Sequence, residues 1–270
     1  MPLEVLKHEA TAKKSETPIL FIHGAWHGAW CWDMHFLPYF AEHGYTSYAL
    51  SLRSHGNSTP KRALRFASVH QYVADVAEVA AQIKAETGKT PAVIGHSMGG
   101  YIVQKYLEKQ DAPAAILLAS IPIAGAIPFI IRAFRFLPHA PLVPLRMLFT
   151  LRGYPLVRTP KLAQLMFFSE AMPLEEIEKL HPLLGDESLR IIPESSILAR
   201  ANPTKVRPTK MLVIAAENDE VFTLKEQRHL ANAYGTEAVI MPNIAHDAML
   251  DIGWERVADR MIAWLGENTI

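Results

Sequence analysis

The chain of 270 residues has little cysteine and no excess of either charge. Cys31 is its single cysteine, and 27 Lys and Arg residues balance 27 Asp and Glu residues. One cysteine excludes an internal disulfide framework and a cysteine-based metal site, so we interpret Cys31 as a small buried hydrophobe. A net charge of zero gives no reason to expect nucleic-acid binding. No internal repeat or low-complexity tract is visible, and 50% hydrophobic residues suffice for one α/β domain with an insertion, or for two small domains.

Signals for export or membrane insertion are also missing. Residues 1–5 form neither a basic n-region nor an apolar h-region, so we expect no signal peptide and a cytoplasmic protein. The stretch 112–131 carries no charge and is formally long enough to cross a bilayer. Three prolines interrupt it, however, and residues 114–121 are typical of a buried strand. We therefore expect no stable membrane span.

Apolar runs alternate with amphipathic helical patterns along most of the chain. Strands are expected at residues 18–22, 46–52, 92–96, 114–121, 210–216 and 238–241. Helices are expected at residues 30–43, 69–87, 101–109, 224–234 and 253–265. Runs that are apolar on both faces suit a parallel sheet covered by helices on each side. The alternation predicts an α/β fold with a doubly wound, mostly parallel sheet.

The alternation breaks between residues 121 and 205, a stretch rich in Pro, Phe, Leu and Arg. Helical pieces are expected at residues 127–136, 142–151, 160–168 and 174–180. We interpret residues 1–120 and 206–270 as the core, and residues 121–205 as a helical lid over the sheet edge where ligands bind. Residues 112–169 hold six basic side chains and no acidic one, so the lid could contact a lipid surface. The plainer alternative is a lid that packs on the core with its arginines in water.

One short stretch organises the chain chemically. The apolar strand expected at residues 92–96 ends within the pattern Gly95-His96-Ser97-Met98-Gly99. A helical pattern follows at once. This pattern fits the G-x-S-x-G nucleophile elbow, a strained strand-to-helix turn whose glycines avoid clashes. We therefore predict that Ser97 is a nucleophile.

A serine needs a base to take its proton and an acid to orient that base, and with this elbow they follow in the order Ser, Asp or Glu, His. Asp219 follows the strand at 210–216, and His246 follows the strand that ends at Met241. Both are expected at the same sheet edge as Ser97, as orienting acid and general base. Glu217 and Asp247 are the rival acids.

Acyl transfer also needs N–H donors for the oxyanion. We expect these from Met98 and from either Ala25 or Trp26, in the turn after the first apolar strand. His23, Gly24 and His96 flank the reacting groups and are predicted to border the substrate site, with the two histidines bracing loops by hydrogen bonds rather than transferring protons. The remaining histidines, including His27, His35, His55 and His181, show no metal-ligand spacing, so we expect no metal and no cofactor.

These features resemble the α/β-hydrolase superfamily. The likeness rests on the His23-Gly24 turn, the loop at 53–58 (similar to R-G-H-G-x-S), the elbow, and the segments of Asp219 and His246. Residues 23–32 are similar to the H-G-x-x-H-G-x-W run of esterases and hydroxynitrile lyases. Residues 167–170 of the lid are similar to bacterial esterases and lysophospholipase-like members.

The resemblance implies a serine hydrolase, without cofactor, that cleaves small carboxylic esters with an apolar acyl or alcohol portion. Dehalogenases and epoxide hydrolases of this fold use Asp where this chain has Ser97, so they are disfavoured. Thioesterase, lactonase, C–C hydrolase, perhydrolase and lyase chemistry remain alternatives, as does a ligand-binding protein without catalysis. A monomer and a homodimer are both compatible with the sequence.

Overall fold

The computed structural model describes residues 2–133, 138, 141–150, 153–207 and 209–270. Its sheet has seven strands in the order β1-β3-β2-β4-β5-β6-β7. β1 runs antiparallel to β3, and all other neighbours are parallel. The strands are β1 (Glu4–His8), β2 (Ile19–Ile22), β3 (Ser47–Ser51), β4 (Ala92–His96), β5 (Ala114–Leu118), β6 (Lys210–Ala216) and β7 (Ala238–Met241). The predicted doubly wound, mostly parallel sheet is confirmed.

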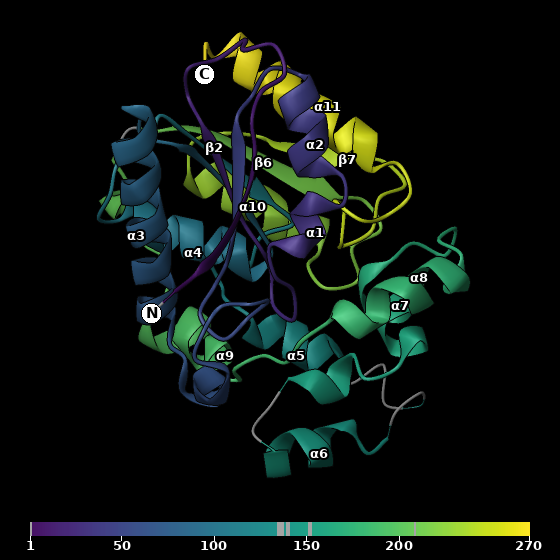
Figure 1. Cartoon of the computed structure of the whole chain (residues 1–270). Helices are drawn as coiled ribbons and strands as arrows, with labels where there is room; N and C mark the ends of the chain where they lie inside the picture. The colour runs from purple at the N-terminus through teal and green to yellow at the C-terminus, as the bar shows by residue number, and fades with distance from the viewer. Residues whose placement is uncertain (1, 134–137, 139–140, 151–152, 208) are drawn as a thin grey trace.

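Helices cover both faces of the sheet, as Figure 1 shows. One face carries α1 (Trp30–Asp33), α2 (Phe36–Glu42) and α11 (Trp254–Glu267), and the other carries α3 (Val69–Thr87), α4 (Met98–Leu107) and α10 (Leu224–Ala233). Every residue of β2, β3, β4 and β5 is buried. Burial on both sides explains why these strands are continuous apolar runs in the sequence.

Several predicted elements differ from the structure in their bounds, and β1 was not predicted at all. Two of the differences have a clear cause in the backbone. The helix expected at 30–43 is divided into α1 and α2 because His35 leaves the helical region (φ −138°, ψ −53°). The strand expected at 114–121 ends at Leu118, because Ala119 turns the chain with a φ of 42°. After this turn the Ile121 N–H donates to the Ser97 carbonyl at 3.0 Å. The end of β5 thereby braces the residue that follows β4.

A helical insertion, residues 121–205, separates β5 from β6. It contains α5 (Ile127–Ala133), α6 (Val143–Thr150), α7 (Pro160–Phe167), α8 (Leu174–Leu180), α9 (Ile191–Pro193), a π-helical turn (Glu194–Leu198) and 3₁₀ turns at Tyr154–Leu156, His181–Leu183 and Pro203–Lys205. A further 3₁₀ turn, Lys61–Phe66, precedes α3 in the core. In Figure 1, α5 to α8 lie together at one end of the molecule. The expected helical residues 134–136 and 151 lie outside the described residues.

Polar contacts tie the helical insertion to the core, among them two that lie toward its opposite ends. Near the start of α3, the Glu194 carboxylate accepts the Val69 N–H at 2.7 Å and the Arg190 guanidinium donates to the Phe66 carbonyl at 2.7 Å. At α5, the two terminal nitrogens of Arg132 each lie 2.9 Å from an oxygen of Glu226 on α10. The insertion is therefore held at both of its ends, over the carboxyl edge of the sheet.

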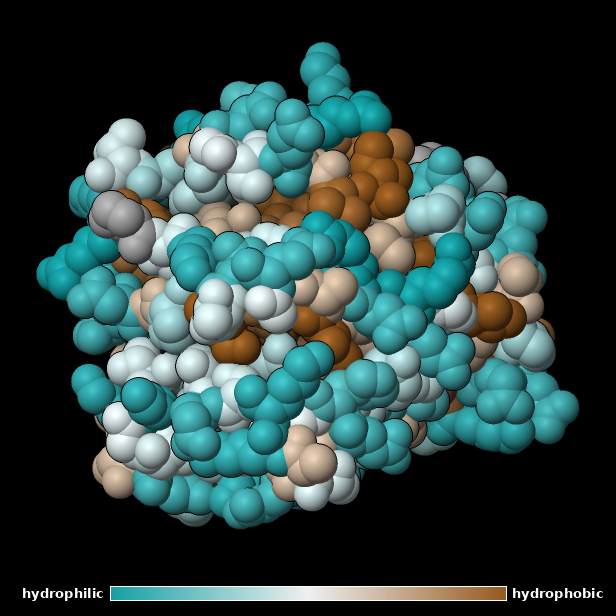
Figure 2. All heavy atoms as spheres, turned by 90° about the horizontal axis from the view of Figure 1, so that it is seen from above, coloured by the Kyte–Doolittle hydropathy of each residue, from teal (hydrophilic) through white to brown (hydrophobic). Residues whose placement is uncertain are grey.

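The surface shows where apolar side chains are left in water. Across the described residues, no helix combines the length and the apolar character needed to cross a bilayer. Figure 2 views the end away from the helical insertion, where hydrophobic residues form separate patches between hydrophilic ones. Exposed apolar side chains on the insertion include Phe149 (78%), Ile131 (64%) and Leu142 (55%).

Candidate active site

Ser97 occupies a strained turn between β4 and α4. Its backbone lies at φ 52° and ψ −115°, a region that non-glycine residues seldom adopt. Its N–H donates to the Leu118 carbonyl at 3.0 Å, which holds the turn against β5. A Cβ on Gly99 would overlap the carbonyl oxygens of Ile22 and His23, so this close approach of backbones requires glycine. The expected elbow geometry is present.

The structure brings Ser97, His246 and Asp219 together, although they lie far apart in the sequence. His246 Nε2 is 3.0 Å from Ser97 Oγ, and His246 Nδ1 is 2.9 Å from Asp219 Oδ2. Asp219 Oδ1 also accepts the N–H groups of Val221 at 2.7 Å and Phe222 at 2.9 Å. A carboxylate held in this way fixes the proton on Nδ1 and leaves Nε2 free to accept the serine proton.

The two rival carboxylates have other contacts. Glu217 is exposed and accepts the Asn243 N–H at 2.9 Å. Asp247 points to a different histidine, with its Oδ2 3.0 Å from His27 Nε2. Asp219 is therefore the carboxylate that the structure sets against Nδ1 of His246.

Histidine rings fix both peptide groups of the turn after β2. His23 Nδ1 donates to the Gly24 carbonyl at 2.7 Å, while its Nε2 accepts the Leu52 N–H at 3.0 Å. His27 Nδ1 lies 2.7 Å from the Ala25 carbonyl oxygen. In a trans peptide the N–H points away from the C=O, so both rings set the directions of the next two N–H groups, those of Ala25 and Trp26. Either N–H is compatible with the oxyanion role.

His23 and His96 are buried, and burial determines their charge. Burial lowers the pKa of His23 well below its ordinary value, and neighbouring histidines lower it further. Burial and then His246 lower the pKa of His96 to about 3. Both rings are therefore neutral, and His96 Nε2 donates to the His246 carbonyl at 2.9 Å. Neither His23, Gly24 nor His96 lines the cavity described next, so their predicted contact with substrate finds no support there.

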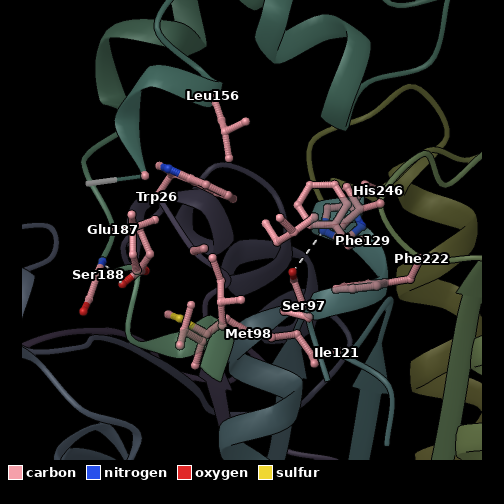
Figure 3. A pocket seen from close by; sticks show the side chains of 18 residues that line it. Trp26, Ser97, Met98, Ile121, Phe129, Leu156, Glu187, Ser188, Phe222 and His246 are labelled. Carbon is pink, nitrogen blue, oxygen red and sulfur yellow. Dashed lines mark hydrogen bonds between the residues drawn. The ribbon is translucent and has the colours of Figure 1, made fainter. Parts of the chain in front are cut away.

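A narrow cavity of about 50 Å³ opens beside Ser97. Figure 3 shows Trp26 and Glu187 on one side, His246 and Phe222 on the other, and Leu156 above. Its lining is mostly apolar and includes Ala25, Trp26, Met98, Ile121, Phe129, Ile130, Leu156, Leu189, Ile191, Ile192, Val221 and Phe222. Seven of these belong to or border the helical insertion, so the insertion forms much of the wall.

Three buried groups near Ser97 are of the type that binds metals. His96, His246 and Asp247 offer atoms within 4.8 Å of one another. Three of their nitrogens are already engaged, since His96 Nε2 donates to a carbonyl and His246 contacts both Ser97 and Asp219, while Asp247 Oδ2 faces His27 Nε2 at 3.0 Å. The arrangement suits hydrogen bonding better than metal ligation.

Burial raises the pKa of Cys31 well above its ordinary value, so this thiol stays protonated.

Several site residues could not be found in the sequence. Glu187 reaches the cavity wall from the helical insertion, and Asp251 accepts both the Ala245 N–H at 2.9 Å and the Ser169 hydroxyl at 2.8 Å. The contact of His27 with Asp247 joins segments at opposite ends of the chain. No residue spacing in the sequence indicates such pairs, because the residues on either side of each partner are equally compatible with an exposed position.

Known proteins resemble this chain to different extents. The model of the alpha/beta hydrolase family matches residues 19–260. A probable esterase, PIR7A from Oryza sativa subsp. indica, is 31% identical over 109 residues, which span 39% of this chain and 40% of the relative. The match thus covers about two fifths of the curated relative.

Solved structures superpose over nearly the whole chain, and two of them serve as examples. The putative non-heme bromoperoxidase BpoC from Mycobacterium tuberculosis has a TM-score of 0.77, 19% identity and coverage of 99% of this chain and 97% of its own. The monoacylglycerol lipase of Paleococcus ferrophilus has a TM-score of 0.72, 16% identity and coverage of 99% and 100%. At these identities the likeness shows the fold alone. Together with the family match, it establishes that this chain belongs to the alpha/beta hydrolase family.

Proposed function

We propose that the chain is a serine hydrolase that cleaves carboxylic esters through an acyl-enzyme intermediate. The observation that carries this proposal is the hydrogen-bonded row from Ser97 Oγ through His246 to Asp219, which opens into an apolar cavity. The partial match to a probable esterase supports the same reaction class. No cofactor takes part in the proposed chemistry.

In the proposed reaction, Ser97 Oγ attacks the ester carbonyl while His246 Nε2 takes its proton. The N–H of Met98, at the start of α4, and that of Ala25 or Trp26 bind the oxyanion. His246 then returns the proton to the departing alcohol. Water attacks the acyl-enzyme by the same route, which regenerates the free serine.

The cavity indicates the kind of ester. Its walls are mostly aromatic and aliphatic, and such surfaces select apolar groups by removing them from water. Phe129 and Ile130 of α5 and Leu156 line it from the helical insertion. We therefore propose that residues 121–205 act as a lid, with residues 1–120 and 206–270 as the catalytic core, and that the acyl or alcohol group of the substrate packs beneath this lid.

The test is hydrolysis of p-nitrophenyl esters from short to long acyl chains, with a fluorophosphonate probe for active serines. We expect turnover by the unmodified chain and loss of at least about three orders of magnitude in kcat with Ser97→Ala. Asp219→Asn should cost about 10⁴-fold, as expected when the base adopts the wrong tautomer. Glu217→Gln, the matched change in the same loop, should leave kcat within about twofold.

Each outcome decides between the candidates. Ester turnover that survives in pure Ser97→Ala would refute the proposal. Probe labelling without turnover of any ester would favour thioester, lactone, C–C, perhydrolysis or lyase chemistry. Tight ligand binding without labelling would favour a binding protein built on the hydrolase fold.

Contact with a lipid surface is a second candidate, favoured by the exposed side chains of Phe149, Ile131 and Leu142 on the helical insertion. Sedimentation with anionic vesicles tests it. Binding that persists in Ser97→Ala and falls at least about fivefold in Phe149→Ser would support it. Equal vesicle binding by the Ser97→Ala and Phe149→Ser variants would count against it. Self-association through the same side chains would appear as a dimer in light scattering without vesicles.

A further inference from the structure

A buried imidazole and a buried carboxylate face each other beside the candidate active site. His27 Nε2 lies 3.0 Å from Asp247 Oδ2, and their side chains are 1% and 0% exposed. Within the described part of the chain, neither Nε2 nor the carboxylate oxygens have an aligned hydrogen bond. Each group is therefore the one placed to compensate a charge on the other.

The partners of His27 indicate that its ring carries two protons. Nδ1 lies 2.7 Å from the Ala25 carbonyl oxygen, which can only accept a hydrogen bond. Nε2 faces a carboxylate, which also only accepts. Burial by itself lowers the pKa of His27, but the charge of Asp247 raises it to a net value above the ordinary one. Burial likewise raises the pKa of Asp247, and the charge of His27 brings it below its ordinary value.

The pair connects the two halves of the reaction site. His27 holds the Ala25 carbonyl and so orients the next peptide N–H in the oxyanion turn. Asp247 directly follows His246, and its own N–H donates to the Phe167 carbonyl at the end of α7 at 2.9 Å. A carboxylate oxygen of Asp247 also lies within 4.8 Å of a ring nitrogen of His246. A fixed negative charge thus stands near the proposed base.

The neighbouring histidines and thiol carry no fixed charge, whereas two further carboxylates stand close to the pair and to His246. Asp219 Oδ2 lies 2.9 Å from His246 Nδ1, and the N–H of buried Asp251 donates to the Asp247 carbonyl at 2.9 Å. His23, at the end of β2, and His96, on β4, are both neutral because burial lowers the pKa of each. Cys31 of α1 remains a thiol. His246 is the group whose charge changes in the proposed reaction. The balance between His27 and Asp247 therefore adds to the field that Asp219 exerts on His246.

We propose that His27 and Asp247 act as a positioning pair for the hydrolase reaction. The buried imidazolium aligns the oxyanion turn, and the carboxylate stabilises the imidazolium that forms on His246 as Ser97 attacks. Neither residue exchanges a proton with substrate. The kinetic consequences rest on the proposed function, whereas the charge state of His27 does not.

Nuclear magnetic resonance of the chain labelled with ¹⁵N in its histidines tests the charge state directly. We expect two protonated ring nitrogens on His27 at neutral pH, and one in Asp247→Asn. One bare nitrogen on His27 in the unmodified chain would overturn the proposal. This measurement needs no turnover, so it separates failure of the pair from failure of the ester hydrolase assignment, and it stays decisive if a variant does not fold.

The pH dependence of kcat/KM tests the effect on catalysis. The acidic limb of this profile is the range in which kcat/KM falls as the pH falls. Asp247→Asn removes the negative charge near His246, so this limb should move to lower pH. His27→Gln leaves that charge without its counter-ion, so the limb should move to higher pH. Both should lower kcat roughly tenfold or more, through a less precise oxyanion turn, with KM changed less than about twofold.

The matched control is His55→Gln, which removes a second buried histidine that pairs with a carboxylate at 3.0 Å, away from His246. Its acidic limb should coincide with that of the unmodified chain. A merely structural role for the His27 pair would lower activity without moving the limb. Limbs that stay in place, or that move in the same direction in both variants, would overturn the proposal.

Discussion

His55, on the loop after β3, and Glu187, on the helical insertion, face each other with Nε2 and Oε2 3.0 Å apart. The Tyr72 hydroxyl of α3 donates to the other carboxylate oxygen of Glu187 at 3.1 Å, and the Ser188 N–H donates to it at 2.7 Å. Glu187 also lines the cavity beside Ser97. One carboxylate thus joins the insertion to the core and forms part of the proposed substrate wall.

Removing this carboxylate should loosen the wall of the cavity. Because the pair is buried, Glu187→Ala leaves His55 and the Tyr72 hydroxyl without their acceptor, and we expect a loss of about 3–5 kcal/mol in the free energy of unfolding. KM for apolar esters should rise more than kcat falls. Urea denaturation and ester kinetics measure the two effects, with the exposed Glu178→Ala as control. Equal stability of the two variants would show that the insertion does not depend on this contact.

Two glycine-to-alanine changes should have opposite effects. At Gly99 the added Cβ would overlap the Ile22 and His23 carbonyls, which are backbone atoms at the end of β2 and cannot rotate away. We expect a loss of roughly 3 kcal/mol or more, together with loss of activity. At Gly266, within α11, the Cβ meets no atom within 4 Å, so alanine should stabilise by about 0.5–1 kcal/mol. Thermal denaturation of both variants checks the pair, and a neutral Gly99→Ala would contradict the elbow packing.

The chain should lose stability on mild acidification. Burial lowers the pKa of His96 to about 3 and that of His23 well below its ordinary value of 6.5. Below pH 6.5 the unfolded chain therefore binds protons that the folded chain excludes. The free energy of unfolding thus decreases as the pH decreases. His27, whose folded pKa is raised, opposes this trend near and above its unfolded pKa of 6.5 and adds no slope well below it, so the fall is steepest in the acidic part of the range.

Each neutral histidine should contribute a slope of about 1.4 kcal/mol per pH unit below its unfolded pKa, so the two together reach roughly 2.7. Urea denaturation between about pH 5 and about pH 7 measures the slope. The exposed His43→Gln should leave it unchanged. A free energy of unfolding that is flat over this range would mean that the two rings are not buried as neutral groups.

Local sequence determined the elements that the backbone forms largely on its own. The helix predicted at 69–87 has those bounds, because Ser68 caps its first turn and Gly88 leaves it with a φ of 73°. The apolar runs at 210–216 and 238–241 also form strands with the predicted bounds. The elbow around Ser97 could be predicted for the same reason, since its glycines and the flanking strand and helix signals lie within a few residues.

Tertiary structure decided what depends on contacts between distant segments. The sequence favours Asp219 over its rivals Glu217 and Asp247, but only the packing of the loops after β6 and β7 sets the Asp219 carboxylate against His246. β1 is stabilised by pairing with β3, which its own short sequence does not signal. The charge of His27 likewise depends on Asp247, a partner more than 200 positions away. Hydrogen bonds and ion pairs require distances that one-dimensional spacing does not contain.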